Sequence, residues 1–325
     1  MLACIVSLLA MPGFAQGDES TRLSLRERWM QRQSDDSATD APLTQPGDFT
    51  FTLRHDGLLR TYRLHVPASY SAARPTPLLV ALHGGGGSMD HQADDARYGL
   101  IGKSEREGFI LVFPNGFSRL RSGKLATWNA GECCGAARDR QVDDVGFIRQ
   151  VVAKVARQMT IDRHRIYAAG MSNGGMMAYR LACEMADVFR AVTAVAGTHN
   201  VRRCTPARPV SVLHIHARND THVLFDGGAG EVFRDPSLVT DFTSVPATVS
   251  TWAGLDGCPA RPRRVLDRPD AYCERYSPCR GGSEVQLCVT ATGGHSWPGG
   301  NKRRGEPASR AISATDLMWD FFSRH

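Results

Sequence analysis

Residues 165–182 read RIYAAGMSNGGMMAYRLA, and this stretch decides the fold. Its first five residues have the apolar character of a buried strand, and the residues after Gly175 have that of a helix. Between them, GMSNG matches the G-x-S-x-G pattern of a nucleophile elbow, a sharp strand-to-helix turn that raises a serine hydroxyl above the sheet. Glycines suit such a turn because it is strained and a helix packs closely beneath it. The sequence therefore predicts Ser172 as a nucleophile.

Short apolar runs on either side of this elbow predict a parallel sheet. Five runs are nearly continuous, as expected for strands buried on both faces, and they cover residues 78–82, 109–113, 166–169, 191–196 and 210–215. Helical segments are expected between most of them, at about 89–107, 144–159, 174–186 and 244–255. A strand at 285–291 and a helix at 308–323 are expected to close the chain.

The start of the folded part has a different pattern. Residues 49–54 and 59–66 alternate apolar and polar side chains around a His-Asp-Gly turn, which is typical of a hairpin. A hairpin followed by alternating strands and helices is the layout of an α/β-hydrolase. The sequence thus predicts a mostly parallel central sheet with helices on both faces and an N-terminal antiparallel hairpin. We expect one catalytic domain over residues 48–325, preceded by a polar arm and linker at 16–47.

Composition places the chain among ordinary soluble globular proteins. Of its 325 residues, 42% are hydrophobic and 22% are charged, so a large core can form. The formal net charge of +6 is modest, and the basic clusters at 202–203 and 261–264 lack interleaved aromatic residues. We therefore expect no nucleic-acid partner. Oligomeric state cannot be inferred from these features.

Residues 1–15 are apolar and end in Gly-Phe-Ala, with small residues at the positions that a signal peptidase reads. The segment is too short to span a bilayer, and no later segment is long and apolar enough to do so. It lacks the usual positive n-region, which leaves a late start codon or a degenerate export signal as alternatives. The expectation is a signal peptide and an extracellular or periplasmic protein.

Cysteine usage supports export. The chain has nine cysteines, and loss of Cys4 with the signal would leave eight, an even number typical of disulfides in exported proteins. None has the C-x-x-C spacing of a zinc site, so no metal is expected. The density of cysteines in 258–288 favours the pairs Cys258–Cys279 and Cys273–Cys288. The adjacent residues Cys133 and Cys134 are expected to reach two different partners among the rest.

A serine nucleophile needs a histidine base oriented by a carboxylate, and in this fold they follow the serine in the order acid, then base. Asp220 follows the strand-like run 210–216, at the carboxyl end where parallel strands collect working residues. His295 follows the last strand within GGHSWPGG, whose glycines free the backbone to carry it over the sheet. We therefore predict Asp220 as the acid and His295 as the base.

Other candidates for these roles fit the pattern less well. Asp226 and Asp241 are alternatives for the acid, set further along the loop. His214 and His216 lie within a strand-like run, where core or supporting roles are expected.

The segment LHGGGG at 82–87 matches the HGGG motif that supplies an oxyanion hole in lipases and esterases. Amides of Gly84 and Gly85 are expected to face the oxyanion together with the amide of Asn173, directly after the nucleophile. No Gly-Lys-Ser/Thr follows the glycines, which argues against a phosphate-binding loop.

Trp128 stands in a loop with two cysteines, and two interpretations stay open: contact with substrate or anchoring in the core. Asp143 and Asp144 precede a helical segment and are expected to cap it rather than act in catalysis.

Together these motifs resemble the exported poly(3-hydroxybutyrate) depolymerase and feruloyl esterase family. The resemblance is carried by WNAGECCG (128–135), VDDVGF (142–147), GMSNGG (170–175), LACE (181–184) and GGHSWPG (293–299). It implies an α/β-hydrolase fold and ester hydrolysis without a cofactor, with Ser172, Asp220 and His295 as the triad. It also supports the loop of Trp128 and Trp297 as parts of the substrate site.

The expected function is that of a secreted serine esterase working by two-step acyl transfer. A poly(3-hydroxybutyrate)-type polyester or its oligomers is the first expected substrate, and a feruloyl or acetyl ester of plant polysaccharide is the alternative. An acyltransferase or a non-catalytic binding protein on the same fold is the alternative from another class.

The chain departs from the family in two places. Relatives commonly read H-G-T-x-D before the acid, whereas this chain has Arg218 in that segment, either tightening the loop by an ion pair or altering the substrate mouth. The second departure is the cysteine-rich insert at 258–288, for which part of a lid is one interpretation.

Overall fold

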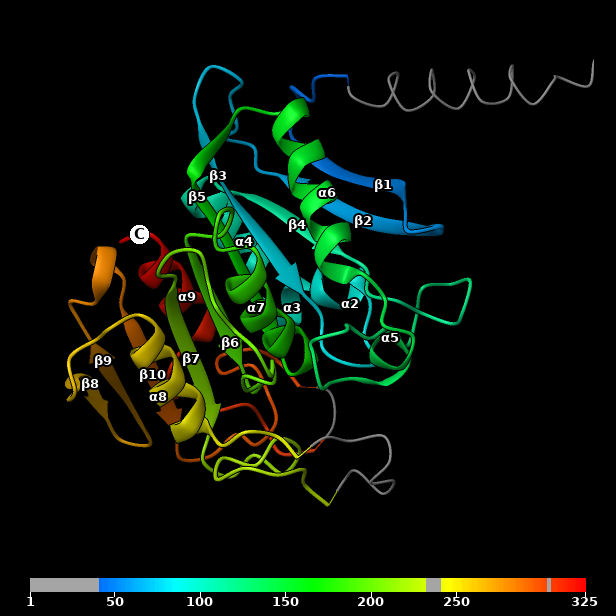
Figure 1. Cartoon of the computed structure of the whole chain (residues 1–325). Coiled ribbons are helices and arrows are strands. Elements are labelled where there is room, and N and C mark those ends of the chain that lie inside the picture. The colour runs from blue at the N-terminus through cyan, green and yellow to red at the C-terminus, as the bar shows by residue number, and fades with distance from the viewer. Residues whose placement is uncertain (1–40, 232–240, 303–304) are drawn as a thin grey trace, which may run out of the picture. The chain divides into compact units, whose positions relative to one another are not determined.

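A twisted sheet of ten strands organises the described part of the chain, which comprises residues 41–231, 241–302 and 305–325 of the computed structural model (Figure 1). The predicted signal peptide and most of the predicted arm lie outside the described residues. From Pro42 to His325 the chain forms one unit. No helix within the described ranges is both long enough and apolar enough to cross a membrane.

The strands follow the order β1-β2-β4-β3-β5-β6-β7-β10-β9-β8 across the sheet. The strands from β4 to β10 in this order run parallel, whereas β1, β2, β9 and β8 pair antiparallel at the two ends. Their bounds are β1 Gly47–His55, β2 Leu58–Val66, β3 Thr76–Leu82, β4 Ile110–Pro114, β5 Ile161–Met171, β6 Ala191–Val195, β7 Ser211–Ala217, β8 Arg263–Arg268, β9 Ala271–Tyr276 and β10 Val285–Thr290. The predicted fold and its N-terminal hairpin are confirmed.

Helices cover both faces of the sheet (Figure 1). They are α2 Met89–Gln92, α3 Asp95–Tyr98, α4 Leu100–Glu107, α5 Gly135–Asp139, α6 Asp144–Gln158, α7 Asn173–Glu184, α8 Val245–Leu255 and α9 Ala314–Phe322, with a 3₁₀ turn at Arg280–Gly282. The single helical segment expected at 89–107 is in fact three short helices. Gly99 separates the last two, because its left-handed backbone (φ 65°) ends α3.

The core consists of two apolar layers, one on each side of the sheet. Along β3, Leu78, Val80 and Leu82 pack with α6, α7 and α8, while Leu79 and Ala81 pack with α4 and α9 on the other side. This alternation follows from the two-residue period of a strand. Each large apolar side chain buried in this way stabilises the fold by about 1.5–3 kcal/mol. The core thus holds the carboxyl ends of the parallel strands at one edge.

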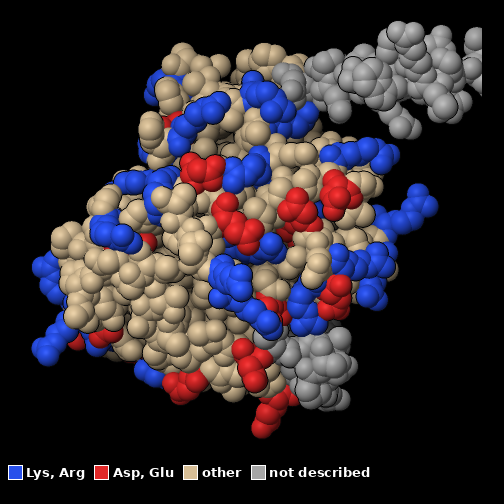
Figure 2. Space-filling model, in the orientation of Figure 1, with Lys and Arg blue, Asp and Glu red and all other residues tan. Residues whose placement is uncertain are grey.

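The insert at 258–288 extends the sheet. Strands β9 and β8 add antiparallel to β10, and the expected disulfides Cys258–Cys279 and Cys273–Cys288 are both present. Strand β8 is an outer strand that carries three exposed arginines, and charged side chains protect such an edge from pairing with other chains. On the face shown in Figure 2, basic and acidic side chains are interspersed, in keeping with the modest net charge.

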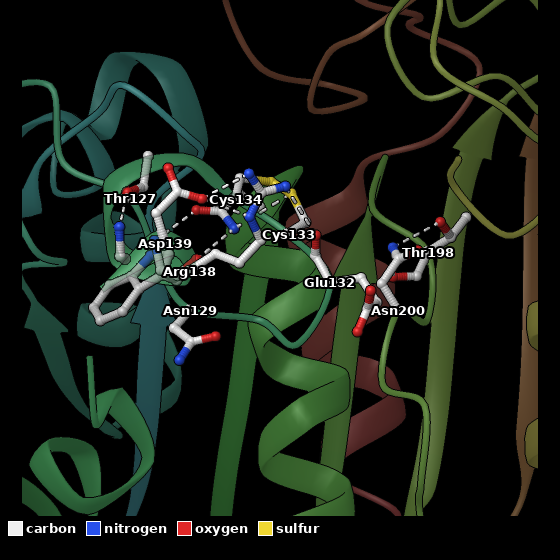
Figure 3. The surroundings of a disulfide bond; sticks show 12 residues. Thr127, Asn129, Glu132, Cys133, Cys134, Arg138, Asp139, Thr198 and Asn200 are labelled. Atoms are coloured by element: carbon white, nitrogen blue, oxygen red, sulfur yellow. Dashed lines mark hydrogen bonds and ion pairs between the residues drawn. A yellow bond between two sulfur atoms is a disulfide. The ribbon is translucent and has the colours of Figure 1, made fainter. Parts of the chain in front are cut away.

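The other four cysteines pair among themselves as expected, but the prediction that Cys133 and Cys134 reach two different partners is wrong. Cys133 and Cys134 pair with each other, as Figure 3 shows. Cys183 at the end of α7 pairs with Cys204, 5.2 Å away between Cα atoms, so that neither is left to bridge to the adjacent pair.

Candidate active site

Ser172 occupies the turn between β5 and α7. Its backbone has φ 55° and ψ −124°, a conformation that costs a non-glycine residue about 1–3 kcal/mol. Tertiary contacts hold it there, because the Ser172 amide donates to the Val195 carbonyl at 2.8 Å. A Cβ on Gly170 would overlap the Gly174 carbonyl, and one on Gly174 would overlap that of Leu82. The turn therefore has the shape of the predicted elbow.

Asp220 lies on the loop after β7 and is 3% exposed. One carboxylate oxygen, Oδ1, accepts hydrogen bonds from the amides of His222 (2.8 Å) and Val223 (3.0 Å). The other, Oδ2, accepts from His295 Nδ1 at 2.8 Å. Burial favours a higher pKa for Asp220, but hydrogen bonds from His216 and His295 hold it far below its ordinary value. Asp220 is thus ionised and aimed at His295.

The loop that carries His295 is tied to the loop that carries Asp220. Gly293 and Gly294 adopt positive φ angles of 110° and 55°, which lets the backbone turn over the end of β10. The Gly294 amide donates to Asn219 Oδ1 at 3.0 Å, and Asn219 Nδ2 donates to the carboxylate of Glu306 at 3.0 and 3.1 Å. Sequence reasoning missed both Asn219 and Glu306, although Asn219 directly precedes the predicted acid.

A second histidine lies against the first. The ring of His222 stacks on that of His295, with 4.5 Å between centroids and 13° between planes. Its position two residues after Asp220 could have pointed to a role beside the predicted base.

The glycine loop after β3 is braced by His83, which is fully buried. Its Nε2 accepts from the Gly116 amide at 2.9 Å, so the proton is on Nδ1, which donates to the Gly84 carbonyl at 2.8 Å. Burial lowers the pKa of His83 to about 4 and keeps the ring neutral, as both bonds require.

Two amides of this loop are available to a ligand. The Gly86 amide donates to Ala126 and the Gly87 amide to Gly84. The amides of Gly84 and Gly85 have no acceptor within the described part of the chain. A Cβ on Gly84 would lie 3.6 Å from the Ser172 Cβ, and one on Gly85 would lie 3.5 Å from the Asn173 Cβ. Both glycines therefore lie beside the elbow.

Trp128 is buried, and its side chain is not part of the described cavity wall. Its indole Nε1 donates to the His83 carbonyl at 2.9 Å, and its backbone exchanges hydrogen bonds of 2.7 and 3.0 Å with the Asn173 side chain. These contacts anchor Trp128 in the core, as one of the two interpretations expects. Trp128 connects the glycine loop to the start of α7, so its contribution to the site is positional.

A cavity of about 500 Å³ opens over the elbow. The glycine loop, Ser172 and His295 line it, and Tyr98 and Trp297 form an aromatic wall with 5.4 Å between ring centroids. Trp297 is 4% exposed, and its indole donates to Thr315 Oγ1 at 2.9 Å. Burial raises the pKa of Tyr98 to about 12, so its phenol stays protonated. The serine and the histidine thus share one cavity with an apolar wall.

Behind Asp220 runs a buried chain of hydrogen bonds. His216 Nε2 lies 2.8 Å from the Val223 carbonyl and 3.4 Å from Asp220 Oδ2, and because a carbonyl oxygen only accepts, this nitrogen carries the proton. His216 Nδ1 then accepts from His214 Nε2 at 3.0 Å, and His214 Nδ1 accepts from the Tyr179 hydroxyl at 2.7 Å. Burial lowers the pKa of His214 well below its ordinary value, as this neutral arrangement requires.

Two clusters of described residues have potential metal-ligand atoms within 4.8 Å of one another. In the first, Asp220 and His295 are already hydrogen-bonded to each other beside His222. In the second, the two cysteines beside His199 form a disulfide, so their sulfurs cannot act as thiolate ligands.

Arg218, the departure from the family pattern, makes no ion pair with the described carboxylates. Its guanidinium lies 3.9 Å from the centroid of the Phe225 ring and 3.4 Å from the Tyr272 hydroxyl. The insert at 258–288 contributes none of the described residues that line the cavity.

Comparison with known proteins identifies the family of this chain. The family model for esterase PHB depolymerase matches residues 60–244. Feruloyl esterase B of Piromyces equi is 30% identical over 239 residues, covering 71% of this chain and 41% of the relative. The NocK protein of Nocardia uniformis subsp. tsuyamanensis, named as an esterase, is 31% identical over 284 residues, covering 82% of this chain and 79% of the relative. The chain thus spans less than half of the first relative but most of the second.

The solved structure of an acetyl xylan esterase from Aspergillus awamori has the same fold. It matches with a TM-score of 0.57 at 14% identity, over 85% of this chain and 100% of that one. On the family match and the relatives above, the chain belongs to the esterase PHB depolymerase family.

Proposed function

We propose that this protein is a serine esterase that cuts carboxylic esters with Ser172, His295 and Asp220. The observation that carries the proposal is the 2.8 Å bond from His295 Nδ1 to the buried Asp220, with His295 and Ser172 on the wall of one cavity. The bond to Asp220 leaves His295 Nε2 as the nitrogen that takes the serine proton.

The reaction has two steps. His295 removes the proton from Ser172, whose oxygen attacks the ester carbonyl carbon, and the proton then passes to the departing alcohol as the C–O bond breaks. Water then takes the place of the alcohol and attacks the acyl-serine by the same route. It releases the acid and restores the Ser172 hydroxyl.

The oxyanion that forms in each step is assigned to the amides of Gly84, Gly85 and Asn173. Support comes from the two glycine amides without acceptors beside the elbow and from the position of Asn173 at the first turn of α7. Removal of one such donor typically raises the barrier by about 2.7–4 kcal/mol.

The first substrate we propose is a poly(3-hydroxybutyrate)-type polyester or its oligomers. The family match and the apolar wall of Tyr98 and Trp297 support it. The names of relatives such as feruloyl esterase B favour the alternative, a feruloyl or acetyl ester of plant polysaccharide. An acyltransferase would use the same residues but pass the acyl group to another alcohol. Four disulfides support a location outside the cytoplasm.

The nucleophile is tested with Ser172→Ala on p-nitrophenyl butyrate. We expect turnover to fall by at least about 10⁴-fold, because the nucleophile of a triad cannot be replaced by its neighbours. Circular dichroism should be unchanged, and Ser69→Ala, an exposed serine away from the cavity, serves as the matched control. Wild-type turnover or fluorophosphonate labelling by the Ser172→Ala variant would refute the assignment.

The substrate is tested on one purified sample. Release of 3-hydroxybutyrate from amorphous polymer and oligomers is compared with release of ferulate from methyl ferulate. Faster ferulate release would favour the plant-ester alternative, and acyl products formed on added alcohols would favour an acyltransferase.

A further inference from the structure

We propose that the mouth of the cavity binds a carboxylate of the substrate, so that the preferred ester carries a free acid group near the bond that is cut. This inference rests on the proposed function and names the class of ester that the same site selects. It is drawn from the charges around the cavity.

The described residues that line the cavity include three permanent cations, Arg97, Lys124 and Lys302, and neither an aspartate nor a glutamate. Arg97 Nε is bound to Asp94 Oδ2 at 2.8 Å, which offsets its charge. Lys124 and Lys302 are exposed, and neither forms an ion pair with a described carboxylate. The mouth therefore keeps two ammonium groups for an anionic ligand.

These lysines come from two different segments of the cavity wall. Lys124 is two residues before Ala126, which exchanges backbone hydrogen bonds with Gly86 and Gly87 of the oxyanion loop. Lys302 follows Asn301, whose amide donates to Arg97, on the segment that also carries His295. A carboxylate held at the mouth would thus lie between the two segments that flank Ser172.

A second observation concerns the charge of Lys302. Burial and then the charge of His295 lower the pKa of His222, the charge of Asp220 raises it, and Lys302 lowers it further. Since His222 stacks on His295, the ammonium of Lys302 acts on the histidine side of the cavity.

The rest of the cavity wall indicates which kind of chemical group carries the carboxylate of the substrate. The cavity wall also has apolar surface, contributed by Tyr98, Trp297, Met171 and the exposed Leu125. A short hydrocarbon segment ending in a carboxylate matches this pairing. Hydroxy-acid oligomers have this chemistry, because each ends in a free acid, and so do half-esters of dicarboxylic acids. Methyl ferulate lacks a carboxylate.

The test compares two esters of equal acyl length, mono-p-nitrophenyl glutarate with a free carboxylate and neutral p-nitrophenyl valerate. In the Lys124→Gln/Lys302→Gln variant, we expect the ratio of their kcat/KM values to fall about 3- to 10-fold, the range for two exposed charge pairs. Salt should lower the wild-type ratio in the same direction. The charge-preserving Lys124→Arg/Lys302→Arg variant should retain most of the wild-type ratio of the two kcat/KM values.

Arg163→Gln is the matched control, because this exposed cation lies near the start of β5, about 30 Å along the strand from Ser172. It should leave both rates and their ratio unchanged. A ratio that stays constant in the double glutamine variant, or that falls as much in Arg163→Gln, would overturn the carboxylate site.

Binding without hydrolysis separates this inference from the proposed function. Calorimetry on Ser172→Ala should show tighter binding of the 3-hydroxybutyrate dimer than of its methyl ester, and tighter binding of glutarate than of valeramide. Adding the two lysine substitutions should remove both differences. Equal affinities for acid and neutral forms would contradict the inference even where the esterase assignment holds.

Discussion

His216 lies directly behind the acid of the proposed triad. Its Nε2–H donates to Val223 and lies within 3.4 Å of Asp220 Oδ2, and its other nitrogen accepts from His214. The proton on His216 Nε2 is thus shared between the Val223 carbonyl and the Asp220 carboxylate, which holds the acid in place. His216 is therefore a positioning residue for Asp220.

We expect His216→Phe to lower kcat/KM for p-nitrophenyl butyrate about tenfold or more, since a hydrogen bond to a charged group contributes about 1.5–3 kcal/mol. Loss of this donor also raises the pKa of Asp220. With its pKa raised, Asp220 gains a proton at a higher pH, so activity that needs the ionised carboxylate should be lost at a higher pH on the acid side.

A pH–rate profile of kcat/KM checks this prediction. His164→Phe, a substitution of an exposed histidine in β5 far from the site, is the control. A variant that loses stability but keeps the wild-type acid limb would assign His216 a purely structural role.

At the scale of elements, the β8–β9 hairpin is separate from the chemistry. It extends the sheet beyond β10, and Cys273 and Cys288 are cross-strand partners that hold it there. Loops that follow β3, β5, β7 and β10 bring the site together, because these parallel strands end at one edge of the sheet.

We expect Cys273→Ser/Cys288→Ser to lower the free energy of unfolding by about 2–4 kcal/mol, the usual range for a disulfide that closes a short loop. Activity on p-nitrophenyl butyrate at 25 °C should stay within about twofold, because no described residue of the hairpin lines the cavity. Urea unfolding and steady-state kinetics measure the two effects. A large loss of kcat with unchanged stability would show that the hairpin takes part in the site.

At the scale of the whole molecule, buried neutral histidines make stability depend on pH. Burial lowers the pKa of His83 from 6.5 to about 4 and that of His214 well below 6.5. Between pH 6.5 and about 4, these histidines bind protons in the unfolded chain but not in the folded chain. Acid therefore favours unfolding. Asp256 and Asp144 act in the opposite direction, because burial raises the pKa of Asp256 to about 6 and that of Asp144 above its ordinary value. They are two groups against the four histidines whose pKa burial lowers, His83, His199, His214 and His222.

We therefore expect the free energy of unfolding to fall as the pH drops from about 6.5 to 4, with His83 alone contributing on the order of 3 kcal/mol. Urea titrations followed by tryptophan fluorescence at a series of pH values measure it. The glutamine in His83→Gln does not titrate, so the free energy of unfolding of this variant should depend less on pH. The variant also weakens the glycine loop. A free energy of unfolding that is constant or rises on acidification would contradict the prediction.

The sequence by itself determined the features that depend on local pattern. The strand–GMSNG–helix order predicts the elbow at Ser172, and the apolar runs predict where strands end, and hence the loops of Asp220 and His295. These inferences hold because the carboxyl ends of parallel strands lie at one edge of the sheet, and this arrangement does not depend on the identity of the other side chains.

Only the tertiary structure decided the rest, because it depends on contacts between residues far apart in the chain. The core position of Trp128 follows from its bonds to His83 and Asn173, and the pairing of Cys133 with Cys134 from the use of Cys183 and Cys204 by each other. Similarly, the two lysines at the cavity mouth are 178 positions apart (302 minus 124) and line one cavity only in the folded chain. Local pattern carries no information on such distances, which packing of the whole molecule sets.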